Sequence, residues 1–582
     1  MFDTRLGAAL NTHSTSCNTD LNCDEDENRM PPISKLAPEI LGRIFEFAVA
    51  PERDIYAVCP SSCAQAEILA KVCKSWRTTA LNWPRMWYHI VDESPTDRAL
   101  SQRRLQRSGI TPLHVYSRIP PTSLFRGVCC DYPDRLQEVH FTIWVTSLDK
   151  VFQALSSPMP NLEFLTLNDR MHVGWDRSPG LPLILGGNTS TLRALALRSV
   201  PFIPGNAFQG LVNLRLEDVP SEVLTIGALL RLLRNCPRLE TIELIDIEPS
   251  FSVGGTVTFE PLSDVYASGS TISPVHLPRL RGLRMGYMST EHMLAILALL
   301  TLPIQLVMRL DNLKHFPSAR TGASPWPSLI ATPISALYGV KRLIYLDVIH
   351  LDDTERKNLH FLSHGEDSGI WFHTSGMRLS NHYQELHQLE RVVSQLDTRD
   401  IVTFRLSILP DTIPALRRTS LRSTLLKMPS LTRLLIKCSQ TLPENPASML
   451  LIWMDEVLAV RSSSSDGGAA EIPAPGLQYL GIQMRCSKPF EPRALEALVR
   501  MSASRQESGH PFSLACNVSA MTREDLAPVS AFVEHLEITD DSLFEINKDV
   551  PAMYMMKNDY WHMFRTDGMA GWNLPEQPDV RR

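Results

Sequence analysis

The sequence predicts an α/β fold in which a small N-terminal helical region precedes an irregular solenoid of helix–strand units with parallel strands. Two observations support this fold class. Apolar residues recur at helical spacing between residues 31 and 90, and a leucine-spaced strand pattern then recurs from residue 136 to residue 538. The 582 residues are enough for two or more domains or for one long repeat array.

Composition divides the chain into four regions. Residues 1–30 are polar and contain the acidic run DEDE, so we expect them to be disordered. We assign residues 31–90 to a helical domain, residues 91–545 to the repeat array and residues 546–582 to a C-terminal tail. The tail includes the aromatic and methionine-rich stretch MYMMKNDYWHMF (553–564), for which we consider two placements, at the end of the array or on its concave face.

The helical domain is rich in apolar residues for its size. Pro38 suits the first turn of a helix, because its missing N–H would be unsatisfied there in any case. The apolar face of this first helix comprises Ile40, Leu41, Ile44, Phe45 and Ala48. The second helix is expected to place Ile68, Val72, Trp76 and Ala80 on one face at four-residue spacing, with Leu69 and Cys73 beside them. A region of about sixty residues buries only about 60% of the surface of its unfolded chain. Much of this apolar surface should therefore contact either the first repeat unit or a partner protein.

The repeat array is predicted from the pattern L-x-x-L-x-L with an apolar residue in each slot. Its copies are LQEVHF (136–141), LEFLTL (162–167), LRALAL (192–197), LVNLRL (211–216), LETIEL (239–244), LRGLRM (280–285), LIYLDV (343–348), LTRLLI (431–436), LQYLGI (477–482) and VEHLEI (533–538). Five copies follow a proline, as in MPNLEFLTL and CPRLETIEL, and several follow a helical stretch that this proline ends. A helix, a proline stop and a short strand are typical of one leucine-rich-repeat unit. The copies lie 19 to 88 residues apart, so the array is irregular, and IQLVMRL (304–310) and IVTFRL (401–406) are candidates for weaker units.

Charged and polar residues fill many of the variable slots of this pattern. They include Glu163, Arg193, Arg215, Glu240, Glu243, Arg281, Arg284, Arg433 and Gln478. Exposed strand positions form the concave surface of a solenoid, which is where such proteins usually bind their ligands. We favour a solvated face for these residues and keep contact with a protein ligand as the second interpretation.

Several other classes of protein are disfavoured. A net charge of −6 and a pI near 6.3, without a basic stripe, argue against nucleic-acid binding. The start of the chain does not resemble a secretory signal. The longest apolar run, Met293 to Met308, is too short to span a bilayer and contains Pro303, so we interpret it as a buried helix leading into a strand. We therefore expect no membrane association and a location in the cytoplasm, the nucleus or both.

No catalytic or cofactor-binding motif is apparent. The chain contains no phosphate-binding glycine loop, no GxSxG nucleophile motif and no HExxH metal motif. Five histidines lie between residues 360 and 387, namely His360, His364, His373, His382 and His387. We favour a solvated insertion between repeats over a metal site for this stretch. The expectation is a protein without catalytic residues, cofactor or metal.

Two separated segments of the helical domain resemble the F-box. LAPEILGRIFEFA is similar to the first half of that motif, and VCKSWRTTALNWPRMW is similar to the second half with its closing Pro-x-Met-Trp. The resemblance covers residues 32–90. The sequence departs from the motif at Ala37, and its spacer PERDIYAVCPSSCAQ is longer than in compact members but similar to those of mushroom-type fungal F-box proteins.

An F-box followed by irregular leucine-rich repeats resembles the substrate-receptor subunits of Skp–cullin–F-box ubiquitin ligases. The resemblance implies that a Skp adaptor, and through it a cullin–RING ligase, binds the helical domain, and that the repeats bind an unknown protein substrate. The adaptor-binding residues would include Leu36, Pro38, Ile40, Leu41, Ile44, Phe45, Val72, Cys73 and Trp76. The alternative is a scaffold without a ligase role, in which the helical domain only caps the solenoid.

Overall fold

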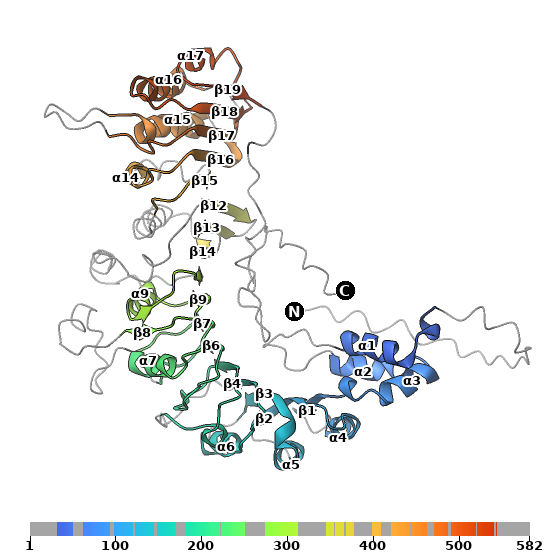
Figure 1. The fold of residues 1–582 in the computed structure, drawn as a ribbon. Helices are drawn as coiled ribbons and strands as arrows, with labels where there is room; N and C mark the ends of the chain where they lie inside the picture. Colours follow the sequence, from blue (N-terminus) through green and yellow to red (C-terminus); the bar gives the residue numbers. More distant parts are fainter. Residues whose placement is uncertain are drawn as a thin grey trace, which may run out of the picture.

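The structure is a computed structural model of the 582-residue chain. The described residues are 32–49, 62–92, 98–119, 123–144, 148–169, 181–221, 223–250, 274–311, 345–353, 356–365, 368–377, 398–408, 421–442, 444–461, 471–486, 490–519, 521–539 and 543. Within them the protein is a mixed α/β structure built on one large sheet, with a separate helical block at its N-terminal end (Figure 1).

The helical block contains three α-helices, α1 (Pro38–Ala48), α2 (Ser62–Leu69) and α3 (Lys74–Leu81), and a closing 3-10 turn at Pro84–Met86. The single second helix that we predicted from the four-residue spacing is wrong. Cys73 has an extended backbone, with φ −154°, and its sulfur accepts a hydrogen bond from the backbone N–H of Trp76 at 3.4 Å. This cap starts a new helix, so Val72 and Cys73 lie in the turn between α2 and α3.

The helical block has its own core, distinct from that of the sheet. This core comprises Leu41, Phe45, Val49, Ala66, Leu69, Ala70, Ala80, Met86 and Trp87. The core of the sheet begins three residues later, at Ile90. Two adjacent cores therefore meet near residue 88.

The large sheet has seventeen strands. From one end to the other, hydrogen-bonded neighbours follow the order β1, β2, β3, β4, β5, β6, β7, β9, β11, β14, β13, β12, β15, β16, β17, β18, β19. The strands up to β11 are β1 (His89–Asp92), β2 (Leu113–Ile119), β3 (Leu136–Ile143), β4 (Phe164–Asp169), β5 (Ala194–Arg198), β6 (Asn213–Glu217), β7 (Thr241–Ile245), β9 (Gly282–Gly286) and β11 (Val307–Asp311). The later strands are β12 (Tyr345–Asp353), β13 (Arg356–His364), β14 (Gly369–Met377), β15 (Thr403–Ile408), β16 (Arg433–Leu442), β17 (Tyr479–Cys486), β18 (Ser513–Val518) and β19 (Leu536–Ile538).

All neighbouring strands are parallel except within β12, β13 and β14. These three form an antiparallel meander that fills the sheet in reverse order, because β14 pairs with β11 and β12 pairs with β15. We predicted one ordinary repeat strand at LIYLDV, and this segment instead begins the meander. His360 and His373 lie opposite each other on β13 and β14, so the histidine-rich stretch forms strands of the sheet up to His373, and His382 and His387 lie outside the described residues.

The ten predicted strand segments all overlap strands of the sheet. The two weaker candidates, IQLVMRL and IVTFRL, overlap β11 and β15. Five strands without a recognised pattern, β1, β2, β13, β14 and β18, complete the sheet. The apolar run from Met293 contributes α9 (Thr290–Ala298) and then β11, as predicted. No helix among the described residues combines the length and the apolar character needed to cross a membrane.

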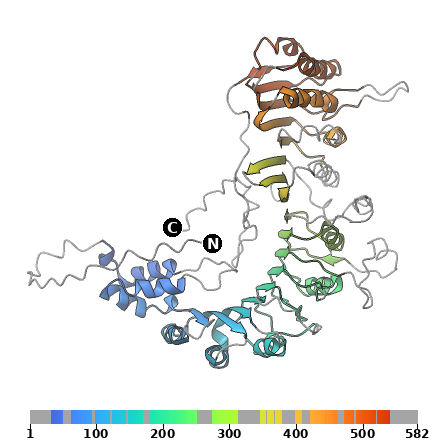
Figure 2. The same cartoon turned by 180° about the vertical axis from the view of Figure 1, so that it is seen from behind.

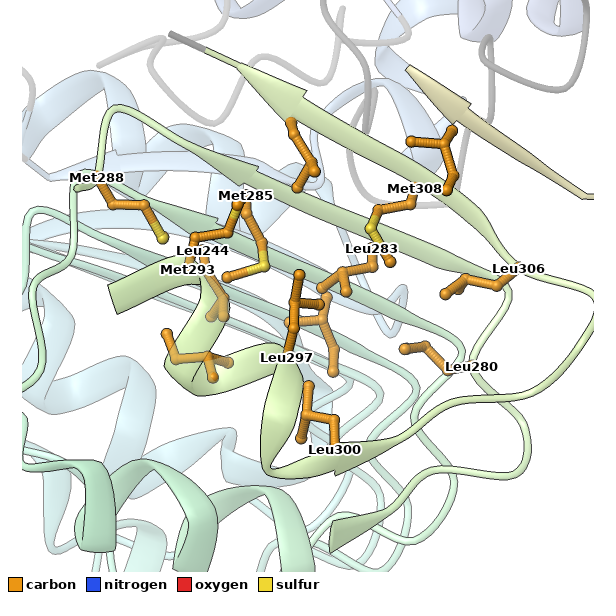
Figure 3. Packing of buried hydrophobic residues seen from close by; sticks show 14 of the residues in the cluster. Leu244, Leu280, Leu283, Met285, Met288, Met293, Leu297, Leu300, Leu306 and Met308 are labelled. Carbon is orange, nitrogen blue, oxygen red and sulfur yellow. The ribbon is translucent and has the colours of Figure 1, made fainter. Parts of the chain in front are cut away.

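The leucine slots come into register across the sheet. Leu165, Leu195, Leu214, Ile242, Leu283 and Met308 are paired in sequence on six neighbouring strands and face the core. Helices cover this side, and Figure 3 shows Met293 and Leu297 of α9 packing against Leu283, Met285 and Met308 of the sheet. The apolar periodicity of the strands and that of the helices therefore build one continuous core.

Helices lie along the outer side of the curved sheet, and the strands line its inner side (Figures 1 and 2). We call the sheet face opposite the helices the inner face. The helices after the block are α4 (Arg98–Arg107), α5 (Ser123–Asp131), α6 (Leu148–Leu155), α7 (Ile226–Arg234), α9, α14 (Leu421–Leu426), α15 (Glu444–Leu458), α16 (Pro492–Glu507) and α17 (Ala527–Ser530). A separate two-stranded pair, β8 (Val275–His276) and β10 (Leu300–Thr301), lies on the helical side of the chain path.

A repeated turn follows four consecutive strands. The first residue after β5, β6, β7 and β9 has a left-handed backbone, with φ between 51° and 57° at Ser199, Asp218, Asp246 and Tyr287. Each of these residues donates its N–H to a carbonyl at the end of the next strand, at 2.8 to 3.0 Å. Left-handed backbone is uncommon outside glycine, so its recurrence at one position marks these segments as structural repeats.

Candidate functional site

The helical block presents an unusual amount of exposed apolar surface. Of the seventeen large apolar side chains that are exposed in the described ranges, eight lie between residues 33 and 81. We call these eight the outward apolar residues. They are Ile33, Leu36, Ile40, Ile44, Phe47, Ile68, Val72 and Leu81. Concentration of such residues in a small part of a chain is typical of a protein-binding surface.

Helix α1 has apolar residues on two sides. Leu41 and Phe45 are 3% and 1% exposed and belong to the core of the block. Ile40, Ile44 and Phe47 are 53%, 41% and 76% exposed and follow one another at i, i+4 and i+7. This spacing places the three on one outward stripe of the helix. The helix therefore contributes one apolar stripe to the fold and leaves a second in solvent.

The predicted adaptor-binding residues divide into three groups. Leu36, Pro38, Ile40, Ile44, Val72 and Cys73 are exposed. Trp76 is partly buried, with its ring 4.9 Å from that of Phe45. Leu41 and Phe45 are core residues, so we correct their assignment: they support the surface from beneath and have almost no accessible area for a partner. Our prediction missed Phe47 and Ile68, although Phe47 continues the spacing that begins at Ile40.

The two predicted half-motifs pack directly against each other. The Trp83 ring lies over Gly42, where an added Cβ would be 2.5 Å from the ring carbon Cδ2. Glu46 of α1 accepts a hydrogen bond from the Trp83 indole N–H at 3.4 Å and forms an ion pair with Arg85 at 3.2 Å. Trp87 is fully buried and donates its indole N–H to the Ala80 carbonyl at 2.8 Å. The closing segment therefore holds α1 in place and fixes the direction of its outward stripe.

The block contacts helix α4, next to the sheet, through residues that lie outside the stripe of Ile40, Ile44 and Phe47. Glu67 of α2 lies 3.9 Å from Arg104 and 3.6 Å from Arg107 of α4, and the Arg107 guanidinium lies 4.5 Å from the Trp87 ring centroid. Ile40 and Ile44 take no part in this junction and remain exposed. The described part of the chain thus leaves the stripe of α1 available to another molecule.

A histidine cluster lies on the first three strands, next to the junction. The rings of His89 and His114 are 5.1 Å apart, and Glu138 lies 3.2 Å from His114 Nδ1 and 3.8 Å from His140 Nε2. Burial lowers the pKa of His89 well below its usual value, and the neighbouring His114 lowers it further. His89 is therefore neutral at pH 7. Among the described residues, no three histidine, cysteine or acidic side chains form a group that could hold a metal ion.

The inner face of the sheet carries a ladder of buried ion pairs. Glu243 of β7 lies 3.0 Å from Arg215 of β6 and 3.7 Å from Arg284 of β9, and Asp311 of β11 lies 3.0 Å from Arg284 and 2.7 Å from Arg309. All five residues are less than 9% exposed. The solvated face that we favoured is therefore wrong for Arg215, Glu243 and Arg284. Parallel pairing in register brings them together, and burial strengthens their attraction.

The other predicted inner-face residues occupy a different position. Glu163, Arg193, Glu240, Arg281 and Gln478 each precede the first residue of a strand, so they lie at the N-terminal ends of the strands. Arg433 starts β16, is exposed, and lies with its guanidinium 5.2 Å from the Tyr479 ring centroid. Comparison of the sequence with protein-family models and with curated proteins finds no match.

Proposed function

We propose that the protein is a substrate-recognition subunit of a Skp–cullin–F-box ubiquitin ligase. In this proposal the helical block is an F-box that binds a Skp adaptor, and the strand array is an irregular leucine-rich-repeat solenoid that binds a protein target. The observation that carries the proposal is the stripe of Ile40, Ile44 and Phe47, which is exposed on α1 and separate from the junction with the sheet.

The exposed apolar area is of the size that a stable complex requires. Full burial of a large apolar side chain contributes about 1.5–3 kcal/mol. The outward apolar residues are on average about half exposed, so burying all eight would contribute a gross ~6–12 kcal/mol. Association itself costs about 4–15 kcal/mol. A stable complex is therefore feasible if the partner covers most of the eight and adds polar contacts at the rim.

The array supplies the second half of the proposed function. Its strands form a long, curved array (Figures 1 and 2). The ladder on β6 to β11 is buried, so we assign contact with an extended protein ligand to the exposed residues at the N-terminal ends of the strands, Arg193, Arg281 and Gln478. The ligase machinery would perform the chemistry, and this protein would act by holding a target lysine near the charged conjugating enzyme. The proposal includes neither nucleic acid nor membrane as a partner, and it locates the complex in the cytoplasm or nucleus.

Co-purification of the full chain with a Skp adaptor tests the proposal. The wild-type chain is expected to retain the adaptor, and the double variant Ile40→Glu, Ile44→Glu is expected to lose it. The matched control is Ile110→Glu, which makes the same chemical change at a residue that is 94% exposed outside the block. Adaptor binding that is absent in the wild type, or unchanged in the double variant, would contradict the proposal.

The second candidate is a non-ligase scaffold whose helical block only caps the solenoid. The contacts of Glu67 with Arg104 and Arg107 favour it, because a cap must pack on the first strands of the array. Under this alternative the full chain would be monomeric and would not bind the adaptor, while Glu67→Gln would lower its melting temperature. The F-box proposal and the cap alternative thus differ in the adaptor-binding result.

A further inference from the structure

Two neighbouring repeat units carry the same turn just before their strands. The turn reads CPRL before β7 and LPRL before β9. In both turns the leucine donates its N–H to the carbonyl three residues earlier, at 3.3 Å. The two strands that follow are parallel and pair without a register shift. The arginines of the two turns, Arg238 and Arg279, therefore occupy equivalent positions in adjacent units.

The next unit continues this row with an apolar residue. His276 pairs with Thr301 in the separate two-stranded pair, and Gly282 pairs with Val307 in the large sheet. The partners are 25 residues apart in both pairs, so the segments between them run side by side with the same offset. Ile304 then lies at the position equivalent to Arg279, and it is 55% exposed.

The arginines of this row are exposed and lack counter-charges. Leu280, between Arg279 and Arg281, belongs to the core (Figure 3). Arg238, Arg279 and Arg281 are exposed, and within the described ranges none of the three side chains forms an ion pair or a hydrogen bond. Glu240, whose carbonyl accepts the Arg281 N–H, forms no ion pair with them. We call Arg238, Arg279, Arg281 and Ile304 the arginine edge.

The chemistry of the arginine edge suits carboxylates. Neighbouring strands are about 4.8 Å apart, so Arg238 and Arg279 bring like charges close together, and a negative group between them relieves the repulsion. All three cations are arginines, whose planar guanidinium groups bind a carboxylate through two hydrogen bonds. Ile304 adds an apolar contact at the end of the row. A cluster confined to two units is too short for the phosphate track along which nucleic acids bind.

We propose that the arginine edge binds an extended, acidic segment of a partner protein. Two carboxylates of the segment would lie near Arg238 and Arg279, and an apolar side chain would lie beside Ile304. Alternate residues of an extended segment are about 6.7 Å apart on one side, a spacing that long arginine side chains can match from neighbouring units. Identification of this segment as part of the ligase target rests on the proposed function, whereas its binding to the edge does not.

Fluorescence anisotropy with the full-length chain tests the proposal. The probe is a labelled synthetic peptide in which glutamate alternates with glycine and is followed by leucine. It should bind the wild-type chain at about 0.01 M salt, where the Debye length is about 30 Å. The double variant Arg238→Gln, Arg279→Gln should weaken binding at least about fivefold, because it removes two charge-assisted contacts. Ile304→Ser should weaken binding about threefold by removing the apolar contact.

Controls separate this binding from general attraction. The net charge of the chain is −6, which disfavours an acidic peptide elsewhere on the surface. Arg493→Gln, Arg523→Gln makes the same charge change at two other exposed arginines and should leave the Kd within about twofold of the wild type. The same peptide with glutamine in place of glutamate should bind at least about fivefold more weakly than the acidic probe.

Three results would overturn the proposal. The wild-type chain could fail to bind the acidic peptide, or the variant Arg238→Gln, Arg279→Gln could bind it as tightly as the wild type. An RNA oligonucleotide could bind more tightly than the peptide and lose this affinity in the same variant, which would make nucleic acid the ligand. None of these measurements involves the adaptor, so failure here is distinguishable from failure of the F-box assignment.

Discussion

Substitutions in the two apolar stripes of α1 should have different effects, although the stripes consist of adjacent residues. Ile40 and Ile44 are 53% and 41% exposed, whereas Leu41 and Phe45 are 3% and 1% exposed. Glutamate at the first pair should abolish adaptor binding and leave the fold intact. Truncation at the second pair should unfold the block. Comparing variants at these two pairs, which are one residue apart, therefore distinguishes residues that bind the adaptor from residues that stabilise the fold.

The expected loss of affinity follows from the exposed fractions. Burying the exposed parts of Ile40 and Ile44 contributes about 1.5–3 kcal/mol in total, and the double variant forfeits this gain. Each glutamate must also be protonated or solvated in an apolar interface, and protonation at pH 7 costs about 3.7 kcal/mol from a reference pKa near 4.3. The combined loss exceeds about 5 kcal/mol, which corresponds to more than about a thousandfold in Kd.

The effect on folding should be small for the outward pair. Substitutions at exposed positions usually change stability by less than about 0.5 kcal/mol. Leu41→Ala, in contrast, removes a fully buried side chain and should cost about 2–5 kcal/mol. Titration of each full-length variant with a Skp adaptor by calorimetry, together with thermal unfolding, measures both quantities. If Ile40→Glu, Ile44→Glu binds within threefold of the wild type, or melts like Leu41→Ala, the assignment of the two stripes is refuted.

Three further predictions concern other parts of the molecule. Gly42→Ala should lower the stability of the helical block by about 1–3 kcal/mol, because the new methyl group overlaps the Trp83 ring; an unchanged melting temperature would show that the ring can move aside. Glu243→Ala should cost about 1.5–3 kcal/mol, because it removes the carboxylate that two buried arginines share, while Arg215 keeps Glu217 and Arg284 keeps Asp311. Denaturant unfolding measures this loss, with Glu217→Ala, which removes a carboxylate from Arg215 and not from Arg284, as the comparison. Stability should fall as the pH decreases below about 6.5, because His89 is neutral in the folded chain and gains a proton on unfolding. His89→Gln should reduce the change of unfolding free energy with pH. If this pH dependence is the same as in the wild type, other groups cause it.

The strands were predictable because each needs only its own local pattern. A strand that packs against helices must present leucine-like residues at alternate positions, and this requirement is visible within six residues, as in LRALAL and LETIEL. The proline that ends the preceding helix strengthens the signal, since its missing N–H breaks the helix wherever the segment lies in space. These local constraints determined the α/β class and most of the parallel strands.

The order of the strands was decided by tertiary structure in one place. Nothing within LIYLDV distinguishes an ordinary repeat strand from the first strand of an antiparallel meander. The distinction depends on which neighbour β12 meets, and it pairs with β15, a strand fifty residues later, rather than with β11. Pairing over such separations is a property of the assembled sheet.

In the candidate sites, too, the sequence determined some features and the tertiary structure decided others. The sequence alone determined that α1 is too apolar for an isolated helix, and the spacing of its residues identified the apolar set. Which half of that set faces inward was decided by the closing segment, because Trp83 over Gly42 and the buried Trp87 orient the helix. Likewise, charges at Arg215, Glu243 and Arg284 were visible in the sequence, but only the register of three parallel strands made them a buried ladder. Local patterns specify which residues are apolar or charged, whereas contacts between distant segments decide which of them are buried.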